Sequence, residues 1–196
     1  MMPTFEAGEA FAKRLDERDP LAHFRERFAL PARDGVPVLY LNGNSLGLMP
    51  KAARDIVAGE LDDWAALAVE AHFSGKTPWF SYHEVLREPS ARLVGGHASE
   101  VVTMNGLTVN LHLMMATFFR PVGSRRKILI EDGAFPSDTY AAQTQLHLHG
   151  IDPVDGLIRV APRPGEALLR TEDLVELIER RGDEIAVVLL PGVQYY

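Results

Sequence analysis

Apolar residues recur at two different spacings along the chain, and the change of spacing divides it into two parts. Between Lys51 and His72, apolar side chains fall three and four positions apart, which is typical of one face of a helix. Pro50 stands where the first residue of such a helix is expected. From Val101 onward, short continuous apolar runs alternate with longer helical patterns. The pattern therefore predicts a largely helical first part and an alternating strand and helix second part.

The remaining segments of the first part are short and polar. The stretch from Glu6 to Arg27 predicts a polar amphipathic helix, with a second helix that starts at Pro20. Val36 to Leu41 predicts a short strand. Asn42 to Gly47 is too rich in turn residues for regular structure. A further helix is expected from Ser81 to Val94.

The second part predicts strands that alternate with helices. The expected strands are VVTM (Val101 to Met104), KILI (Lys127 to Ile130), LIRV (Leu157 to Val160) and IAVVLL (Ile185 to Leu190). The expected helices are Leu107 to Phe119, Ser137 to His149 and Thr171 to Arg181, the last with Thr171 as its N-cap. Continuous apolar strands separated by helices favour an α/β fold with a mainly parallel sheet flanked by helices. A parallel strand is normally followed by a crossover helix, and the last strand runs directly into PGVQYY, so we expect the α/β domain to be truncated.

Composition excludes several classes of chemistry. The chain has 196 residues, 46% of them hydrophobic and 24% charged, which is typical of a globular protein with a sizeable core. It has no cysteine, so disulfides, thiolate zinc sites and thiol nucleophiles are excluded. The net charge is -7 and no basic run exceeds Arg125 to Lys127, so neither nucleic acid nor a membrane surface is an expected partner. The N-terminal stretch lacks the apolar region of a signal peptide.

Two expected corners between a strand and a helix carry candidate chemistry. In open α/β sheets, ligands bind beyond the carboxyl ends of strands, where helix N-termini present free N–H groups. The corner around Gly106 could hold a phosphate, or it could be an ordinary turn with Thr108 as N-cap. The corner around Phe135 could offer a ring to a flat heteroaromatic cofactor, or Phe135 could be a core residue and Ser137 a helix cap. Pattern alone leaves both pairs of alternatives open and favours the structural ones.

A metal centre is not expected. His147 and His149 flank Leu148, but no carboxylate or third histidine lies at a convincing ligand spacing. We therefore interpret both histidines as residues at the end of a helix.

Several segments together resemble kynureninase, a fold-type I pyridoxal-phosphate enzyme of the aspartate aminotransferase-like group. They are YLNGNSLGLMP (Tyr40 to Pro50), PWFSYHE (Pro78 to Glu84), TMNGLTVNLHLMMATFF (Thr103 to Phe119), EDGAFPSDTYAAQ (Glu131 to Gln143) and LLPGVQYY (Leu189 to Tyr196). The segments occur in order, and the resemblance is to the N-terminal part of the family's chain. It implies that residues 1–50 form a helical segment with a strand and turn that would pack with a small domain. Residues 51–196 would be the first part of the large cofactor-binding α/β domain.

The resemblance also implies roles for individual residues. Those that match contacts of pyridoxal 5'-phosphate are Leu107 and Thr108 at its phosphate, Phe135 stacked on its pyridine ring, and Pro136, Ser137 and Asp138 beside it. Ser45 and His72 match positions that line the substrate site. Without the resemblance, Ser45 could equally cap a turn, and His72 could satisfy a carbonyl at a helix end.

The implied activity is hydrolysis of kynurenine or 3-hydroxykynurenine to an anthranilate and alanine, in tryptophan catabolism toward NAD biosynthesis. A cytoplasmic homodimer is the implied assembly. Two positions depart from the family: Asn42 stands where many members have Asp, and Pro191 where some have Ser near the cofactor. Two alternatives stay open. One is another fold-type I enzyme, cysteine desulfurase-like or aminotransferase-like, and the other is a non-catalytic α/β fragment that binds only phosphate or a partner chain.

No catalytic residue is expected within this chain. The Schiff-base lysine, the aspartate that pairs with the pyridine nitrogen and the arginine for the substrate carboxylate belong to later parts of the family's chain. Lys13, Lys51, Lys76 and Lys127 do not lie in matching contexts. We therefore expect the chain alone to be inactive.

Overall fold

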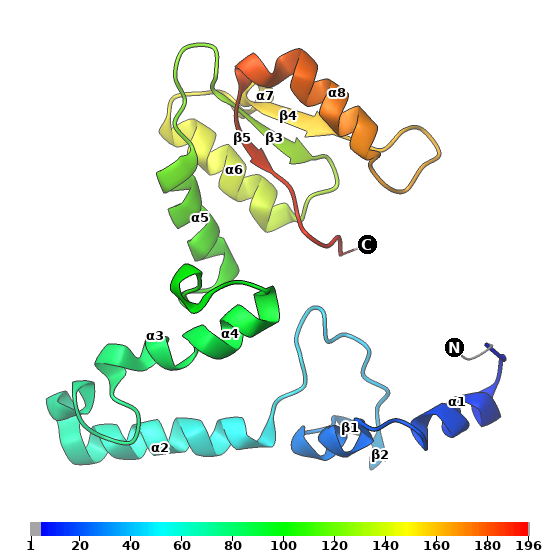
Figure 1. Ribbon diagram of the computed structural model, residues 1–196, viewed down its shortest axis with the longest axis vertical. Helices are drawn as coiled ribbons and strands as arrows, with labels where there is room; N and C mark the ends of the chain where they lie inside the picture. The colour runs from blue at the N-terminus through cyan, green and yellow to red at the C-terminus, as the bar shows by residue number, and fades with distance from the viewer. Residues whose placement is uncertain (1–4, 196) are drawn as a thin grey trace. The chain divides into compact units, whose positions relative to one another are not determined.

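The computed structural model describes residues 5–195, which form two compact units, one up to Val85 and the other from Leu86 onward (Figure 1). The two units are defined by contacts between residues of this chain. The boundary predicted between Pro50 and Lys51 separates two domains of a longer enzyme, so these contacts do not test it and it stays a prediction. Among the described residues, no helix combines the length and the apolar character needed to cross a membrane.

Unit 1 consists of short elements around one long helix. They are α1 (Glu9–Asp16), the 3₁₀ helix η1 (Ala22–Arg27), β1 (Ala32–Arg33), β2 (Val36–Pro37), α2 (Lys51–Leu67), the 3₁₀ helices η2 (Ala68–His72) and η3 (Trp79–Ser81), and α3 (Tyr82–Val85). The second N-terminal helix begins at Ala22, two residues beyond the predicted Pro20. The strand predicted from Val36 to Leu41 ends at Pro37. Its two residues pair antiparallel with the equally short and exposed β1, which leaves the rest without a ladder partner in that sheet.

The long helix α2 stops earlier than its apolar spacing predicts. Pro50 precedes it as the N-cap residue, and Lys51 is its first residue. It ends at Leu67 because Ala68 has a φ of 48°, a backbone conformation that side chains with a Cβ rarely adopt. The chain continues as η2 to His72. The helical segment predicted up to His72 is therefore broken into an α-helix and a 3₁₀ helix.

Unit 1 buries little apolar surface. Among its described residues, Ala71 is the only one in the buried class. The apolar residues of α2 that the sequence predicted as one face are present at that spacing, but Val57, Leu61 and Trp64 are 57–61% exposed. The face predicted for α2 is therefore uncovered within this chain.

Unit 2 contains the parallel sheet. Its elements are α4 (Arg87–Val94), the 3₁₀ helix η4 (Ala98–Glu100), α5 (Leu107–Phe118), β3 (Lys127–Glu131), α6 (Pro136–Leu148), α7 (Pro153–Gly156), β4 (Leu157–Val160), α8 (Thr171–Arg181), the 3₁₀ helix η5 (Gly182–Glu184) and β5 (Ile185–Leu189). The strand order is β4-β3-β5, and both neighbouring pairs are parallel. The predicted α/β class, with a parallel sheet flanked by helices, is confirmed for this unit (Figure 1).

The central strand β3 divides the core of unit 2 between the two faces of the sheet. Ile128 and Ile130 pack against α5 and α6, where the other buried members of the cluster are Met115, Phe119, Ala142, Leu146 and Ile151. Leu129 packs on the other face, with Ile158, Val160 and Ile185 and with Leu174 and Leu177 of α8. Because successive side chains of a strand point to opposite faces, a continuous apolar run such as Ile128 to Ile130 is what a strand covered on both faces requires.

Two local predictions for unit 2 are wrong. The segment VVTM is not a strand. Val101 has extended backbone angles (φ −120°, ψ 135°). An extended segment becomes a strand only when a neighbouring strand forms backbone hydrogen bonds with it. No strand among the described residues pairs with residues 101–104. Thr171 is not an N-cap, because it is already the first residue of α8 and Arg170 occupies the cap position.

An ion-pair cluster fastens the amino end of the sheet. The carboxylate of Glu184 accepts two hydrogen bonds from Arg181, both of 3.0 Å, and lies 2.6 Å from the ammonium of Lys127 on β3. The hydrogen bond from Arg181, followed by the interaction with Lys127, lowers the pKa of Glu184 from 4.5 to about 2. Glu184 therefore binds its proton less readily in the folded chain than in the unfolded chain.

The Glu184→Gln variant is expected to unfold with less dependence on acid pH. A carboxyl whose pKa falls on folding stabilises the fold above its unfolded pKa and loses that contribution as pH drops toward its folded pKa. For Glu184 this window lies between pH 4.5 and about 2. Thermal unfolding measured across the window, with the exposed Glu179→Gln as control, tests the assignment. An acid-induced loss of equal size in Glu184→Gln and the wild type would contradict it.

Candidate functional site

Helices α5 and α6 begin at the end of unit 2 where β3 and β5 finish (Figure 1). The two helices lie side by side and share an apolar contact through Met115, Phe119, Ala142 and Leu146. A polar contact adds to it, because the side-chain nitrogen of Gln145 lies 3.1 Å from Nδ1 of His112. Two helix N-termini, each with a positive dipole end, are therefore brought to the carboxyl edge of the sheet. The first turn of α5 has free N–H groups, whereas at α6 Pro136 has no N–H and the amide of Asp138 donates to the carbonyl of Phe135.

Two asparagines, Asn105 and Asn110, stabilise the corner before α5 by hydrogen bonds to each other. The side-chain amide of Asn110 donates to the backbone carbonyl of Asn105 over 3.0 Å, and the amide of Asn105 contacts the side-chain oxygen of Asn110 at 3.3 Å. Gly106 is the N-cap residue and has no side chain to cap the helix, so the predicted alternative of Thr108 as N-cap is wrong. Thr108 lies in the first turn, where the backbone amides have no acceptor inside the helix. This corner can bind an anion.

Gly106 borders open space at the N-cap of α5. Its φ of −67° suits any residue, and a Cβ placed on it would meet no atom within 4 Å. Neither the backbone nor the packing of this chain therefore requires glycine at this position. A group that must approach the backbone closely, such as a phosphate, gives glycine a reason to be there.

The corner after β3 presents an aromatic ring. Phe135 is the N-cap residue of α6, and Pro136 follows as the first helical residue, a favoured place for proline. The ring of Phe135 is 52% exposed and belongs to neither core cluster, so it is not a core residue of this chain. The hydroxyl of Ser137 contacts the carboxylate of Asp138 at 3.3 Å and does not cap the helix. Polar oxygens and one ring face are thus available beside the N-terminus of α6.

The segment after β5 joins this corner. The ring of Tyr195 stands edge-on to that of Phe135, with centroids 5.2 Å apart and an interplanar angle of 83°. The side-chain amide of Gln194 donates to the carboxylate of Glu131, a buried residue at the carboxyl end of β3. Sequence reasoning assigned no role to these three residues. The signal that could have found Glu131 is a charged residue directly after the apolar run Ile128 to Ile130.

The predicted substrate residues Ser45 and His72 lie in unit 1. Ser45 is in a turn where its backbone amide and that of Leu46 donate to the carbonyl of Asn42 over 3.0 and 3.1 Å. His72 is exposed at the end of η2, and its ring stands edge-on to that of Trp79. Each has its own local support. The six predicted cofactor residues, by contrast, all lie in unit 2 at the N-termini of α5 and α6.

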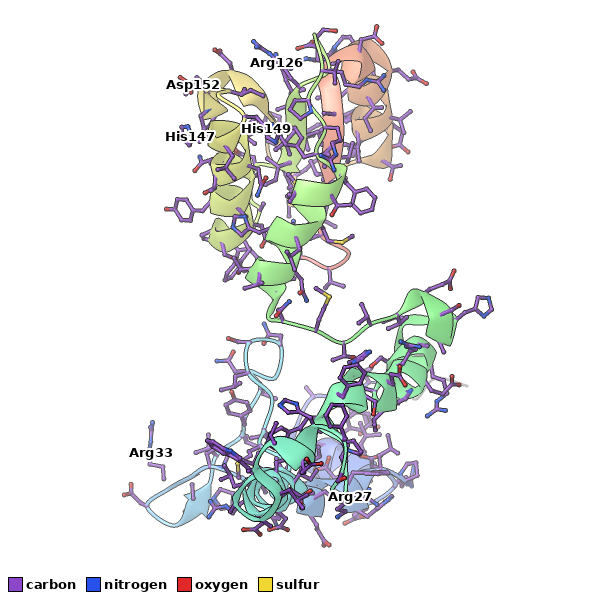
Figure 2. The ribbon with its side chains drawn as sticks, turned by 90° about the vertical axis from the view of Figure 1, so that its left-hand side faces the viewer. Arg27, Arg33, Arg126, His147, His149 and Asp152 are labelled. Carbon is purple, nitrogen blue, oxygen red and sulfur yellow. The ribbon has the colours of Figure 1, made fainter. Side chains whose placement is uncertain are left out.

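The opposite end of unit 2 carries His147, His149 and Lys127, the single lysine between residues 86 and 196. Figure 2 shows His147 and His149 there with Arg126, far along α6 from the helix start. His149 packs edge-on against Phe119, with ring centroids 5.2 Å apart. Lys127, the first residue of β3, is held by Glu184 at this end. Within the described residues, no group of three His, Asp or Glu side chains is arranged to hold a metal ion.

Comparison with curated proteins identifies close relatives of the chain. It is 55% identical to kynureninase from Koribacter versatilis over 192 residues. These residues are 97% of this chain and 45% of that kynureninase. It is 52% identical over 192 residues to kynureninase from Myxococcus xanthus, with the same coverage, and 47% identical over 193 residues to kynureninase from Flavobacterium johnsoniae. No protein-family model matches the chain. The predicted resemblance is therefore confirmed: the chain is similar to kynureninases over nearly all of its length, and it spans about half the length of the curated kynureninases that it matches.

Proposed function

We propose that this chain forms the cofactor-binding edge of a kynureninase of fold type I. The reaction is hydrolysis of kynurenine or 3-hydroxykynurenine to anthranilate or 3-hydroxyanthranilate and alanine. The observation that carries the proposal is the identity of 47–55% to curated kynureninases over nearly the whole chain. The arrangement of unit 2 supports it, because two helix N-termini and an exposed ring gather at the carboxyl edge of a parallel sheet.

The residues at this edge fit pyridoxal 5'-phosphate. A phosphate needs N–H donors and close approach to the backbone, which the first turn of α5 and Gly106 provide, with the hydroxyl of Thr108 as a further donor. A pyridine ring needs a flat face, which the half-exposed Phe135 provides. The residues that would hold the cofactor are Leu107, Thr108, Phe135, Pro136, Ser137 and Asp138. When bound, this cofactor supplies the electron sink that stabilises negative charge at the substrate's α-carbon.

The residues of this chain act by binding and orientation. The corner before α5 would hold the phosphate, and Phe135 would offer its face to the ring of the cofactor, which would orient the bound substrate. Ser45 and His72 position the aryl ketone end of the substrate through a hydroxyl and an imidazole. We assign no proton transfer to these residues. Lys127 is placed at the amino end of β3 and paired with Glu184, which does not suit it to anchor the cofactor.

Gly106→Ala is expected to weaken binding of pyridoxal 5'-phosphate about fivefold, an effect on the scale of one impaired hydrogen bond. The added methyl group would occupy open space at the N-cap of α5, where the phosphate is proposed to bind. The free energy of unfolding should change by less than about 1 kcal/mol, because the methyl group clashes with nothing in the chain. An absorption titration measures the affinity. Gly182→Ala is the matched control, since Gly182 also has a negative φ of −56° and no atom within 4 Å of its Cβ position. Equal weakening by both variants would contradict the phosphate assignment.

Anthranilate release tests the activity itself. Anthranilate is fluorescent, so kynurenine and 3-hydroxykynurenine can each be supplied to the 196-residue chain and to the intact protein from its source. The proposal predicts an anthranilate and alanine in equal amounts from the intact protein, and no turnover by the 196-residue chain. Sulfur release from cysteine, or amino-group transfer without cleavage of the carbon–carbon bond, would indicate another fold-type I enzyme. Failure to bind the cofactor would indicate a non-catalytic fragment.

We also propose that the protein works as a homodimer in the cytoplasm. The exposed apolar face of α2, with Ile56, Val57, Leu61 and Trp64 each 55–61% exposed, supports association with another surface. Light scattering on the intact protein would show twice the mass of one chain, and a monomer would contradict the proposed assembly.

A further inference from the structure

We propose that Glu60 and Trp79 are positioning residues that fix the imidazole of His72, and that they thereby determine how the protein binds the aromatic end of its substrate. The inference rests on the proposed function, because it refines the substrate role of His72. Neither Glu60 nor Trp79 has a role in the cofactor corners described above. Both belong to unit 1, as His72 does, so all the contacts concerned lie within one compact unit.

A hydrogen bond between two side chains is the first element of this arrangement. The indole Nε1–H of Trp79 donates to Oε2 of Glu60 over 2.7 Å, in a partly buried position. Bonds to a carboxylate are stronger than bonds between neutral groups, so this one holds the indole plane firmly against α2. The indole in turn meets the imidazole of His72 edge-on, with centroids 5.6 Å apart and ring planes at 87°. That is a favoured geometry for two aromatic rings.

A second carboxylate of α2 fastens the loop between His72 and Trp79. Asp63 lies three residues after Glu60, on the same side of the helix, and accepts the backbone amide of Lys76 over 3.0 Å. The turn needs glycine at position 75, where φ is 108° and a Cβ would lie 2.7 Å from Oδ2 of Asp63. The chain therefore leaves η2 at His72, is tied to α2 at Lys76, and is tied again at Trp79.

The imidazole of His72 is exposed and yet has a fixed neighbour. An exposed side chain usually loses freedom when a ligand binds, and that loss weakens affinity. A ring already held edge-on by Trp79 loses less, and it can present its plane and its nitrogen to a flat aryl ketone in one orientation. Because such preorganisation acts on substrate binding and not on the bond cleavage, its loss should raise KM more than it lowers kcat.

Proton NMR of the chain tests the positioning directly. The chain has two tryptophans, so two indole N–H signals are expected, and Trp64→Phe identifies the signal of Trp79. Glu60→Ala should move the Trp79 signal upfield and shift the ring signals of His72, which His72→Gln identifies. Glu60→Gln retains an acceptor oxygen and should restore much of the wild-type spectrum. Trp79→Leu should remove the contribution of Trp79 to the ring-current shift of His72 and leave that of Phe73, whose ring centroid lies 6.2 Å away. Trp64→Phe, at a residue 61% exposed on α2, should leave the shift unchanged.

Kinetics of the intact protein test the consequence. Glu60→Ala and Trp79→Phe should raise KM for kynurenine about tenfold, with kcat within about twofold of the wild type. Glu60→Gln should recover most of the affinity, and Asp55→Asn, at an exposed carboxylate of the same helix, should match the wild type. Circular dichroism confirms that each variant is folded, and the conservative Trp79→Phe and Glu60→Gln variants keep the test valid if an alanine variant unfolds.

The outcomes separate the inference from the proposed function. His72 signals that stay unchanged in both Glu60→Ala and Trp79→Leu would overturn the inference. Shifted signals with an unchanged KM would also overturn it, because the pair would then be purely structural. A wild-type protein that releases no anthranilate would instead refute the proposed function, and the spectra alone would then decide whether Glu60 and Trp79 position His72.

Discussion

Phe119→Ala is expected to lower the free energy of unfolding of unit 2 by about 3–5 kcal/mol. Phe119 follows the end of α5 and is 0% exposed, packed in the cluster that joins α5 and α6 to β3. Its removal leaves a cavity between the sheet and these helices, and it also removes the edge-on partner of His149. Since a domain of this size has roughly 5–15 kcal/mol of stability in total, the variant should be close to unfolding. Urea denaturation followed by circular dichroism measures the loss.

The neighbouring residue provides a matched control. Phe118 differs from Phe119 by one position along the chain but is 62% exposed. Phe118→Ala removes the same group from the surface, where a substitution usually changes stability by about 0.5 kcal/mol or less. Similar losses in the two variants would contradict the packing described for α5.

Phe135→Ala is expected to weaken binding of pyridoxal 5'-phosphate by about tenfold to a hundredfold. Stacking of an aromatic side chain on a flat heterocycle contributes about 1–3 kcal/mol, and no other aromatic ring is assigned to the cofactor. The stability of the chain should change little, because the ring is 52% exposed and lies outside both core clusters. An absorption titration measures the affinity.

Phe135→Tyr distinguishes a stacking role from a general effect on the corner. Tyrosine retains the ring face, so its affinity for the cofactor should stay within about threefold of the wild type. If Phe135→Ala binds as tightly as the wild type, Phe135 does not stack on the cofactor, and the assignment of the corner after β3 is wrong.

The hydrophobic pattern of the sequence predicted some helices and strands with their observed bounds. LIRV is β4 with the predicted bounds, and Thr171 to Arg181 is α8 with the predicted bounds. VVTM is rich in β-branched residues, as strands usually are, yet it forms no strand. A strand depends on a partner that its own residues do not specify. The break at Ala68 was also not predictable, since alanine in an apolar helical pattern gives no stop signal.

The candidate site was predictable only in part. Gly106 and Phe135 could be recognised as residues of corners, but pattern left a structural and a functional alternative for each, and the resemblance to kynureninase favoured the functional one. The contacts that support the site join residues distant in sequence. Trp79 and Glu60 are 19 residues apart, and Gln194 and Glu131 are 63 residues apart. No spacing rule connects such residues, so their roles required the fold.

The central claim is that pyridoxal 5'-phosphate binds where α5 and α6 begin. The most direct test is to titrate the ¹⁵N-labelled chain with this cofactor and to follow the chemical shifts of its backbone amides. The account predicts that the largest shifts fall on Leu107, Thr108 and Val109 in the first turn of α5, and on Phe135, Ser137 and Asp138 at the start of α6. Gly106→Ala should reduce these shifts at equal cofactor concentration. Shifts confined to other residues, such as Lys127 at the opposite end of β3, or no shifts at saturating cofactor, would contradict the account.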